Sequence, residues 1–409
     1  EDPQLREGAL WAAEGDIQRR MAAPGAPDPA NMSRLGHVPT LAPELAFNGF
    51  RRMGQALQAR AERLPARLAA FREDGTIPYA RDPGREDYSR GHHSDTAVGY
   101  SATPLLQALM DAAVVGDQQH IDRALGVLDR LNETYENGVP RGAQTWELSL
   151  HTPDILASAA MVRCNVIACQ LTGEQRYLEH ARYWAWTAVP FIYLVQPTAG
   201  EIGLYATIAV YGATSWVAPL WIGQPVQWCG LVHAASLYQL AEVDDSAPWA
   251  EIAKGIATVG MQTTWDESDE ERQGLLPDFV VLEPQHRDGP AINPATVLAT
   301  LPPVYGGTTW DHLVVAPGSG TIIHAMRPVE VLEEGDGVLV LHAGDWGGVR
   351  PTRLLLSRLP APVASVEVRP SGSDEAFAPI IEFGNIAAFK AATIAAGNDM
   401  DVRITLAPN

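Results

Sequence analysis

Apolar residues in the middle of the chain recur every three or four positions, as they do on one face of an α-helix. The clearest stretch begins near Thr152, breaks at Thr172-Gly173 and resumes after Glu174. Its apolar positions are Ile155, Ala159, Val162, Val166 and Cys169, followed by Tyr177, Ala181, Trp184 and Ala188. A glycine that stops one periodic run just before another begins predicts two helices joined by a tight turn, an αα-hairpin.

The same pattern occurs twice more. One hairpin turns at Gly116-Asp117, between apolar stripes at 105–109 and 121–131, and another turns at 244–246, between stripes at 231–238 and 249–259. A further helix is predicted over about 44–71, with an interruption at Pro65, and another opens the chain. Repeated hairpins predict stacked helices, either as a solenoid or as a closed toroid.

The pattern changes at about Leu313. A short apolar run at 338–341 and alternating apolar positions at 366–368 and 402–406 are typical of β-strands, and Gly and Pro punctuate the region. We therefore predict a mainly α protein of two domains. Residues 1–312 form a helical-hairpin toroid, complete or incomplete, that carries the catalytic site, and residues 313–409 form a small accessory β-sandwich.

Composition narrows the class of partner. The 409 residues are 46% hydrophobic and carry a formal net charge of −20. An acidic surface repels phosphate backbones, so nucleic acid is not an expected partner. No apolar run reads as long enough to span a bilayer, so a membrane is not expected either. The three cysteines lie in apolar helical patterns without a CxxC pair, which predicts core residues and not a disulfide framework.

The hairpin pattern also predicts where the chemistry lies. Tight turns fall on one rim of such a stack and the connections between hairpins on the other, and here four connections are long: 88–96, 140–154, 211–228 and 276–294. They are rich in aromatic, histidine and acidic residues, whereas the tight turns are not. Because long loops in compact domains are usually functional, we expect the site where these four converge.

Glu147 is the first candidate for a general acid. It follows Trp146 and precedes Leu148, and an unpaired carboxylate in apolar surroundings has a raised pKa, as a proton donor requires. A structural ion pair is the alternative. Asp95 and Asp154 are candidates for the base or nucleophile, although either can instead cap a helix N-terminus, as Thr152-Pro153 before Asp154 suggests. Asp288 is held in reserve.

The aromatic and histidine residues of the loops supply the binding candidates. Tryptophan faces can stack on sugar rings, although each can equally be a core residue. A single histidine is more often structural than catalytic, and no fixed-spacing metal motif is present, so neither a metal nor a cofactor is predicted. The catalytic candidates are Glu147, Asp95, Asp154, His151 and His93. The substrate-binding candidates are Tyr88, His92, Trp146, Trp221, Trp228, His286, Arg287, Asp288 and Asn293.

These hairpins, the long aromatic and acidic loops and the C-terminal β-domain together resemble the six-hairpin glycosidase-like (α/α) toroid superfamily. The Trp146-Glu147 and His151-Thr-Pro-Asp154 segment looks like an active-site loop of that class. The resemblance covers about residues 44–300 and is architectural. It implies either a glycoside hydrolase or a polysaccharide lyase, since both chemistries use this fold.

Three functions stay open at this point. A glycoside hydrolase would use Glu147 with Asp95 or Asp154. A lyase acting on a uronate polymer would draw its base or acid from His93, His151, Tyr88 or Tyr100, and would neutralise the uronate with Arg287, Arg141 and Asn293. The third is a glycan-binding protein without turnover. We rank the hydrolase first, with a poly- or oligosaccharide as partner. From that substrate class we expect a secreted or periplasmic location, although no signal peptide is visible in the sequence.

Overall fold

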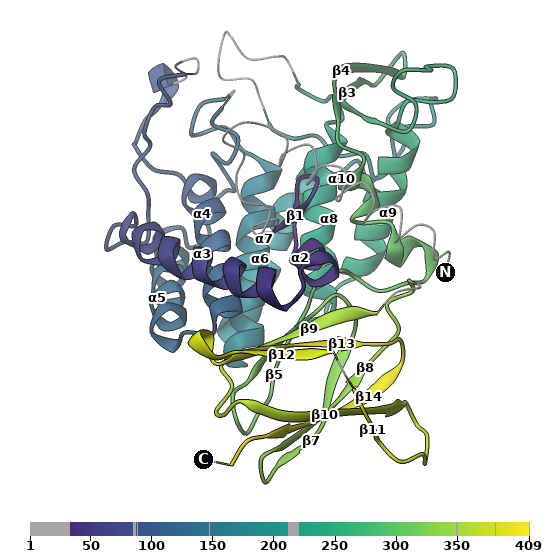
Figure 1. The fold of residues 1–409 in the computed structure, drawn as a ribbon. Helices are drawn as coiled ribbons and strands as arrows, with labels where there is room; N and C mark the ends of the chain where they lie inside the picture. Colours follow the sequence, from purple (N-terminus) through teal and green to yellow (C-terminus); the bar gives the residue numbers. More distant parts are fainter. Residues whose placement is uncertain are drawn as a thin grey trace.

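The computed structural model describes residues 33–84, 87, 89–146, 148–211, 221–348, 351–380 and 382–408. Glu147 and Tyr88, two of the candidates above, lie outside the described residues. The described chain forms a helical layer that rests on a β-sandwich (Figure 1).

The three predicted hairpins are confirmed. They are α4–α5 (Val98–Val115, Gln118–Thr134), α6–α7 (Ile155–Thr172, Gln175–Ala188) and α8–α9 (Gln227–Ala241, Trp249–Thr263). Gly116 and Gly173 end α4 and α6 with φ values of 73° and 72°, a left-handed conformation that glycine adopts at little cost. Asp117 then caps α5, since its side chain accepts a hydrogen bond from the backbone N–H of His120.

The first helix of each hairpin is an inner helix. Helix α6 packs between α4 and α8 and is buried on every side, whereas α5, α7 and α9 each bury one stripe and expose the opposite face. Helix α6 has the length and composition of a membrane span, which the sequence reading missed, but 72% of that stretch is buried inside the protein.

The predicted helix over 44–71 is two helices, and its interruption is not at Pro65. Helix α2 (Ala42–Phe47) ends at Asn48, whose backbone is extended, and α3 (Phe50–Ala69) runs through Pro65 without a break. Arg60 of α3 forms ion pairs with Glu44 of α2 and Asp111 of α4, and all three side chains are buried. This network fastens both helices to the first hairpin.

The segment 276–294, predicted as a long loop, is instead an antiparallel β-hairpin. Strand β3 (Leu276–Val281) pairs with β4 (His286–Ile292), and the ladder carries a bulge between Pro277 and Phe279. The alternation in β4 is polar and largely exposed, so it lacks the apolar pattern by which a strand is recognised. A smaller hairpin, β1 (Arg34–Leu35) and β2 (Val38–Pro39), precedes α2.

The β-rich C-terminal region predicted from the sequence contains two five-stranded antiparallel sheets. One has the order β11-β10-β14-β8-β7 and the other β12-β13-β9-β6-β5. The strands are β5 (His312–Val315), β6 (Ile322–Ala325), β7 (Val329–Gly335), β8 (Val338–Ala343), β9 (Thr352–Ser357), β10 (Val363–Pro370), β11 (Ala378–Pro379), β12 (Phe383–Ile386), β13 (Ala391–Ala396) and β14 (Met400–Leu406). Their facing side chains form a separate core.

The second sheet is buried on both faces. Leu354 and Leu356 of β9 enter the sandwich core, while Leu355 between them enters the helical core. In β6, Ile323 and Ile322 divide in the same way. Since successive side chains of a strand point to opposite faces, one sheet joins the two cores.

Candidate functional site

A cavity of about 640 Å³ lies against the inner helices. Residues of α4, α6 and α8 form one side, and the opposite side comes from residues 33–40, from the β3–β4 hairpin and from residues 299–311. Of the sequence candidates, Trp146, Trp221 and Trp228 line this cavity. A cavity of this volume is in the range that holds a small-molecule ligand.

Three aromatic rings gather at one end of the cavity. The rings of Trp146 and Trp228 stack at an interplanar angle of 29°, with centroids 6.4 Å apart, and the His37 ring is tilted by 40° against Trp228 at a centroid distance of 4.7 Å. Backbone and ring nitrogens of His37 lie 3.1 Å from the hydroxyl of Thr296, which fixes the β1–β2 turn beside Trp228. Flat aromatic faces of this kind suit the C–H faces of sugar rings.

Asp278 is the carboxylate at this end. Its Oδ1 accepts a hydrogen bond of 3.1 Å from the indole N–H of Trp228. Burial raises the pKa of Asp278, and the Trp228 hydrogen bond opposes that shift only in part. A carboxyl group whose pKa is raised can carry the proton that a general acid donates.

The bulge in the β3–β4 ladder positions Asp278. It falls between Pro277 and Phe279, at the strand position that Asp278 occupies. Gly289 crosses directly opposite with φ of +80°, and a Cβ atom on Gly289 would lie 2.6 Å from the Cβ of Asp278. Bulges redirect side chains next to functional sites, and here the glycine leaves the room that Asp278 needs.

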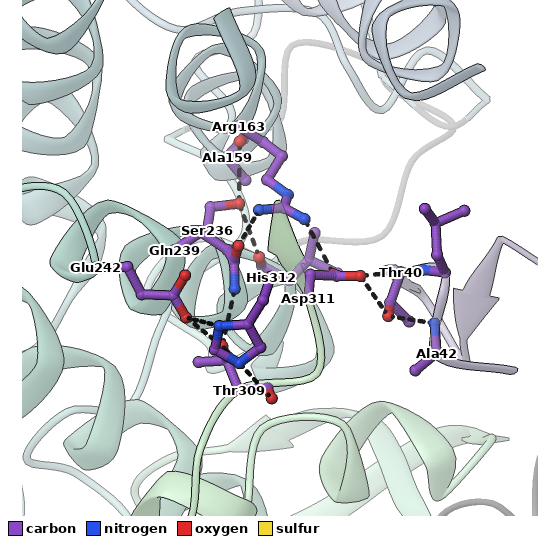
Figure 2. Close-up of polar contacts among 12 residues, drawn as sticks. Thr40, Ala42, Ala159, Arg163, Ser236, Gln239, Glu242, Thr309, Asp311 and His312 are labelled. Atoms are coloured by element: carbon purple, nitrogen blue, oxygen red, sulfur yellow. Dashed lines mark hydrogen bonds and ion pairs between the residues drawn. The ribbon is translucent and has the colours of Figure 1, made fainter. Parts of the chain in front are cut away.

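The other end of the cavity is a buried polar cluster (Figure 2). Arg163 of α6 donates one hydrogen bond of 2.5 Å to the side-chain oxygen of Gln239 on α8 and one of 3.0 Å to Asp311. The other oxygen of Asp311 accepts from the hydroxyl of Thr40 at 2.9 Å and from the backbone N–H of Leu41 at 3.0 Å. The positive charge of Arg163 is therefore balanced by the Asp311 carboxylate, and both oxygens of that carboxylate accept hydrogen bonds.

This cluster continues toward the β-sandwich. Gln239 donates to the hydroxyl of Thr309, which in turn donates to Glu242. His312, the first residue of β5, lies 3.4 Å from Glu242. The cluster therefore connects the inner helices with the chain that leads into the sandwich.

The first two predicted loops do meet, but away from the cavity. The imidazole Nε2 of His151 accepts hydrogen bonds from the backbone N–H groups of His93 and Ser94, and Nε2 of His92 accepts from the N–H of Leu150. Burial lowers the pKa of both rings, and repulsion adds to it, from His151 on His92 and from His93 and Arg141 on His151. In these contacts the two rings act as neutral acceptors that join one loop to the other.

Asp154 is the N-cap of helix α6, the structural one of the two roles predicted for it. Its carboxylate accepts hydrogen bonds from the N–H of Leu156 in α6, from the N–H groups of Ala143 and Gln144, and from the Gln144 side chain. Burial raises the pKa of Asp154 to about 6, against the effect of these donors. Because Ala143 lines the cavity, Asp154 holds in place the loop that leads to Trp146.

The remaining described candidates lie outside the cavity lining. Asp95 is exposed and pairs with Arg72. Asp288 bonds to the N–H of Gly289, and Arg287 donates to backbone carbonyls of residues 262 and 263. His286 is exposed on β4, and Asn293 bonds to the N–H of Ala295 at the start of α10 (Ala295–Leu298). Within the described residues no group of three or more His, Cys, Asp or Glu side chains is arranged to hold a metal ion.

The sequence reading missed Asp278, Arg163, Asp311 and His37. Arg163 carried a signal, because a charged residue stands in the middle of an apolar inner helix. Asp278 lies within the segment 276–294, which the sequence predicts to be a loop and from which Asp288 is the carboxylate candidate. Asp311 and His37 approach the helices only through contacts between distant parts of the chain.

Comparison with known proteins finds similarity at the level of structure. No protein-family model matches the chain, and no curated protein matches it. An inactive variant of an α-1,6-mannanase from Salegentibacter sp. HEL1_6, in complex with α-1,6-mannotetrose, is 15% identical, with a TM-score of 0.40 over 62% of this chain and 64% of that one. An unsaturated glucuronyl hydrolase from Bacillus sp. GL1 is 13% identical, with a TM-score of 0.38 over 61% and 67%.

A GH76 α-mannanase from Bacteroides thetaiotaomicron is 12% identical, with a TM-score of 0.38 over 61% of this chain and 65% of that one. These neighbours are (α/α) toroid, glycosidase-like proteins, the superfamily that the sequence resembles. This chain spans less than two thirds of the length of the mannanases it matches. At these identities and TM-scores, no activity or substrate passes from the neighbours to this chain.

Proposed function

We propose that this chain is a carbohydrate-active enzyme, a glycoside hydrolase that binds a glycan in the 640 Å³ cavity and uses Asp278 as its proton donor. One observation carries the proposal. A carboxyl group with a raised pKa lies in a cavity lined by tryptophans and is hydrogen-bonded to one of them. That combination supplies a sugar platform and an acid at the same place.

Glycoside hydrolysis needs a second carboxylate, as base or nucleophile. Among the described lining residues, the carboxylates are Asp278 and Asp311. Both oxygens of Asp311 already accept hydrogen bonds, which makes it a poor attacking group. We therefore assign this role to Glu147, which follows the lining residue Trp146 in the chain, and move the acid role that the sequence predicts for Glu147 to Asp278.

The chemistry is then ordinary hydrolysis. Asp278 gives its proton to the glycosidic oxygen as the bond to the anomeric carbon breaks. Water, activated directly by the second carboxylate or arriving after that carboxylate has attacked, supplies the hydroxyl that replaces the leaving group. The proton that water releases restores the starting state of the enzyme.

The test is a panel of neutral and uronate-containing polysaccharides, followed by new reducing ends and by the ultraviolet absorbance of the unsaturated uronate that elimination produces. We expect reducing ends without that absorbance. Asp278→Asn should lower kcat by about 10²–10⁴-fold with little change in KM, because it removes the proton but keeps the shape. Asp288→Asn, an exposed carboxylate on the same hairpin, is the matched control, and Glu147→Gln tests the second carboxylate.

Other outcomes would reject the proposal in different ways. Full activity of the Asp278→Asn protein would remove Asp278 from the acid role. If the ultraviolet absorbance of the unsaturated uronate rises together with the number of reducing ends, the reaction is elimination and not hydrolysis. Glycan binding without turnover on any member of the panel would favour the glycan-binding protein.

A further inference from the structure

The cavity is a shaft that runs along the inner helices. Trp228 and Gln239 both line it and are eleven residues apart on α8, which is about 16 Å at the rise of an α-helix. Leu156 and Arg163 also line the cavity and are seven residues apart on α6, which is about 10 Å along the helix axis. Asp278, bonded to Trp228, is therefore far from Arg163 and Gln239.

Exposed residues border one end of this shaft. Arg34, His37 and Pro290 are exposed lining residues, and His37 touches Trp228 at the Asp278 end. At the opposite end Arg163 and Gln239 are 7% and 5% exposed, and the side chain of Asp311 is 16% exposed. The mouth is thus beside Asp278, and the deep end is the polar cluster.

Among the described residues, the deep end is closed. Arg163, Gln239 and Asp311 also line a separate cavity of only about 30 Å³ on their other side, where His324 of β6 takes part in the lining. The hydrogen bonds from Arg163 to Gln239 and Asp311 therefore form a floor between the shaft and the sandwich (Figure 2). A polymer lying across the site would need two openings, and the described residues provide a floor where the second would be.

The floor suits a neutral sugar. The positive charge of Arg163 is balanced by Asp311, and Gln239 adds an uncharged amide. Such a surface both donates to and accepts from hydroxyl groups, whereas an anionic group would have to displace Asp311 from its ion pair.

We propose that the shaft takes the end of a glycan chain, with the terminal neutral sugar against Arg163, Gln239 and Asp311. This inference rests on the proposed function and deepens it. The bond near Asp278 is then cut at a fixed distance from the chain end, and water adds to the anomeric carbon as the leaving oxygen takes the Asp278 proton. The product is a short oligosaccharide of one length.

Product analysis on whichever linear polysaccharide the protein cleaves tests this directly. We expect one short product from the earliest time points, and viscosity that falls slowly relative to the rise in reducing ends. A ladder of product lengths with rapid loss of viscosity would overturn the chain-end inference and leave the hydrolase intact.

Binding to the Asp278→Asn protein gives a readout that does not depend on turnover. Calorimetry should show binding of a linear oligosaccharide and none of the same sugar closed into a ring. Equal binding of both would overturn the chain-end inference. No binding of any glycan in the panel would overturn this inference together with the proposed function.

A second pair of variants addresses the floor. Gln239→Leu should weaken binding of the linear oligosaccharide by about threefold to tenfold, the range of one hydrogen bond. Gln170→Leu is the matched control, because Gln170 lies on α6 and lines the small cavity without lining the shaft. Melting curves check that both proteins fold, and equal affinity of the two variants would remove Gln239 from the site.

Discussion

At the residue scale, the environment of Asp278 is made by two neighbours. Trp228 supplies a hydrogen bond that favours the ionised carboxylate, while burial disfavours it, and burial prevails. Gly289 supplies space, because its φ of +80° and missing side chain let the strands cross where Asp278 stands. Chemical and steric control of this carboxyl can therefore be separated by mutation.

The first prediction concerns pH. A general acid must be protonated, so activity is lost as the pH rises through the pKa of Asp278. Because burial raises that pKa, the alkaline limb of the pH–activity profile should lie above the usual pKa range of an aspartate. Trp228→Phe keeps an aromatic ring at this position but removes the indole N–H that stabilises the ionised carboxylate, so the limb should move to higher pH. The pH profile of kcat/KM measures both effects, and a shift to lower pH would contradict the assignment.

The second prediction concerns space. Gly289→Ala places a Cβ 2.6 Å from that of Asp278 and should lower kcat and change the alkaline limb of the pH profile. Gly274→Ala is the matched control, since Gly274 also has positive φ, +75°, but no heavy atom lies within 4 Å of the added Cβ. Each substitution costs about 1 kcal/mol of backbone strain. Equal kinetics of the two variants would show that Gly289 does not position Asp278.

At the element scale, the turn between α8 and α9 depends on one carboxylate. Asp244 is buried, which would raise its pKa, but donors from Arg182, Trp249 and Ser246 outweigh burial and leave the pKa well below the ordinary value. The indole N–H of Trp249, the first residue of α9, is one of these donors. The return helix is therefore anchored by hydrogen bonds to an ionised group.

A third prediction follows for this turn. A carboxylate whose pKa is depressed in the folded protein stabilises it above the ordinary pKa near 3.8, and this stabilisation is lost as the pH falls through and below that value. Asp244→Asn should lower the free energy of unfolding by about 1–3 kcal/mol at neutral pH and by progressively less below pH 4. Denaturant unfolding at several pH values measures this. Asp245→Asn, exposed and adjacent, should have little effect at any of them.

The same scale explains what the sequence could predict. The hairpin helices follow from local periodicity and from glycine turns. The turns at Gly116 and Gly173 and the apolar stripes of the inner helices could therefore be predicted from the sequence. The β3–β4 hairpin was not, because β4 has no apolar alternation and its bulge breaks the register. Trp146 and Trp228 were recognised by residue type, whereas Asp278 depends on a strand pairing and Asp311 on a contact with Thr40, which is 271 residues away.

At the scale of the whole molecule, the helical layer and the sandwich share buried contacts. His324 of β6 lies 3.1 Å from the carbonyl of Ala113 in α4, and Ser357 of β9 donates to the carbonyl of Val114. Ile322 and Leu355 are buried in the helical core. We expect the two layers to unfold in one transition, since separating them would expose these residues to water.

The fourth prediction is an acid sensitivity of this contact. Burial lowers the pKa of His324 to about 4, so the folded protein keeps the ring neutral where the unfolded chain, with its ordinary value near 6.5, binds a proton. Stability should therefore fall as the pH drops from about 6.5 toward 4, by up to about 1.4 kcal/mol per pH unit. Comparing His324→Gln with the native protein over that range isolates the contribution. Parallel stability curves would show that His324 does not titrate in this way.

The bond between Thr40 and Asp311 has a consequence for biosynthesis. Thr40 belongs to the wall of the shaft, and its carboxylate partner leaves the ribosome 271 residues later. The helical hairpins depend on contacts between neighbours in sequence and can form early on the nascent chain, but the floor cannot close until the segment before β5 has been translated. A ribosome stalled before residue 311 should therefore carry hairpins that resist protease and a glycan site that does not yet exist.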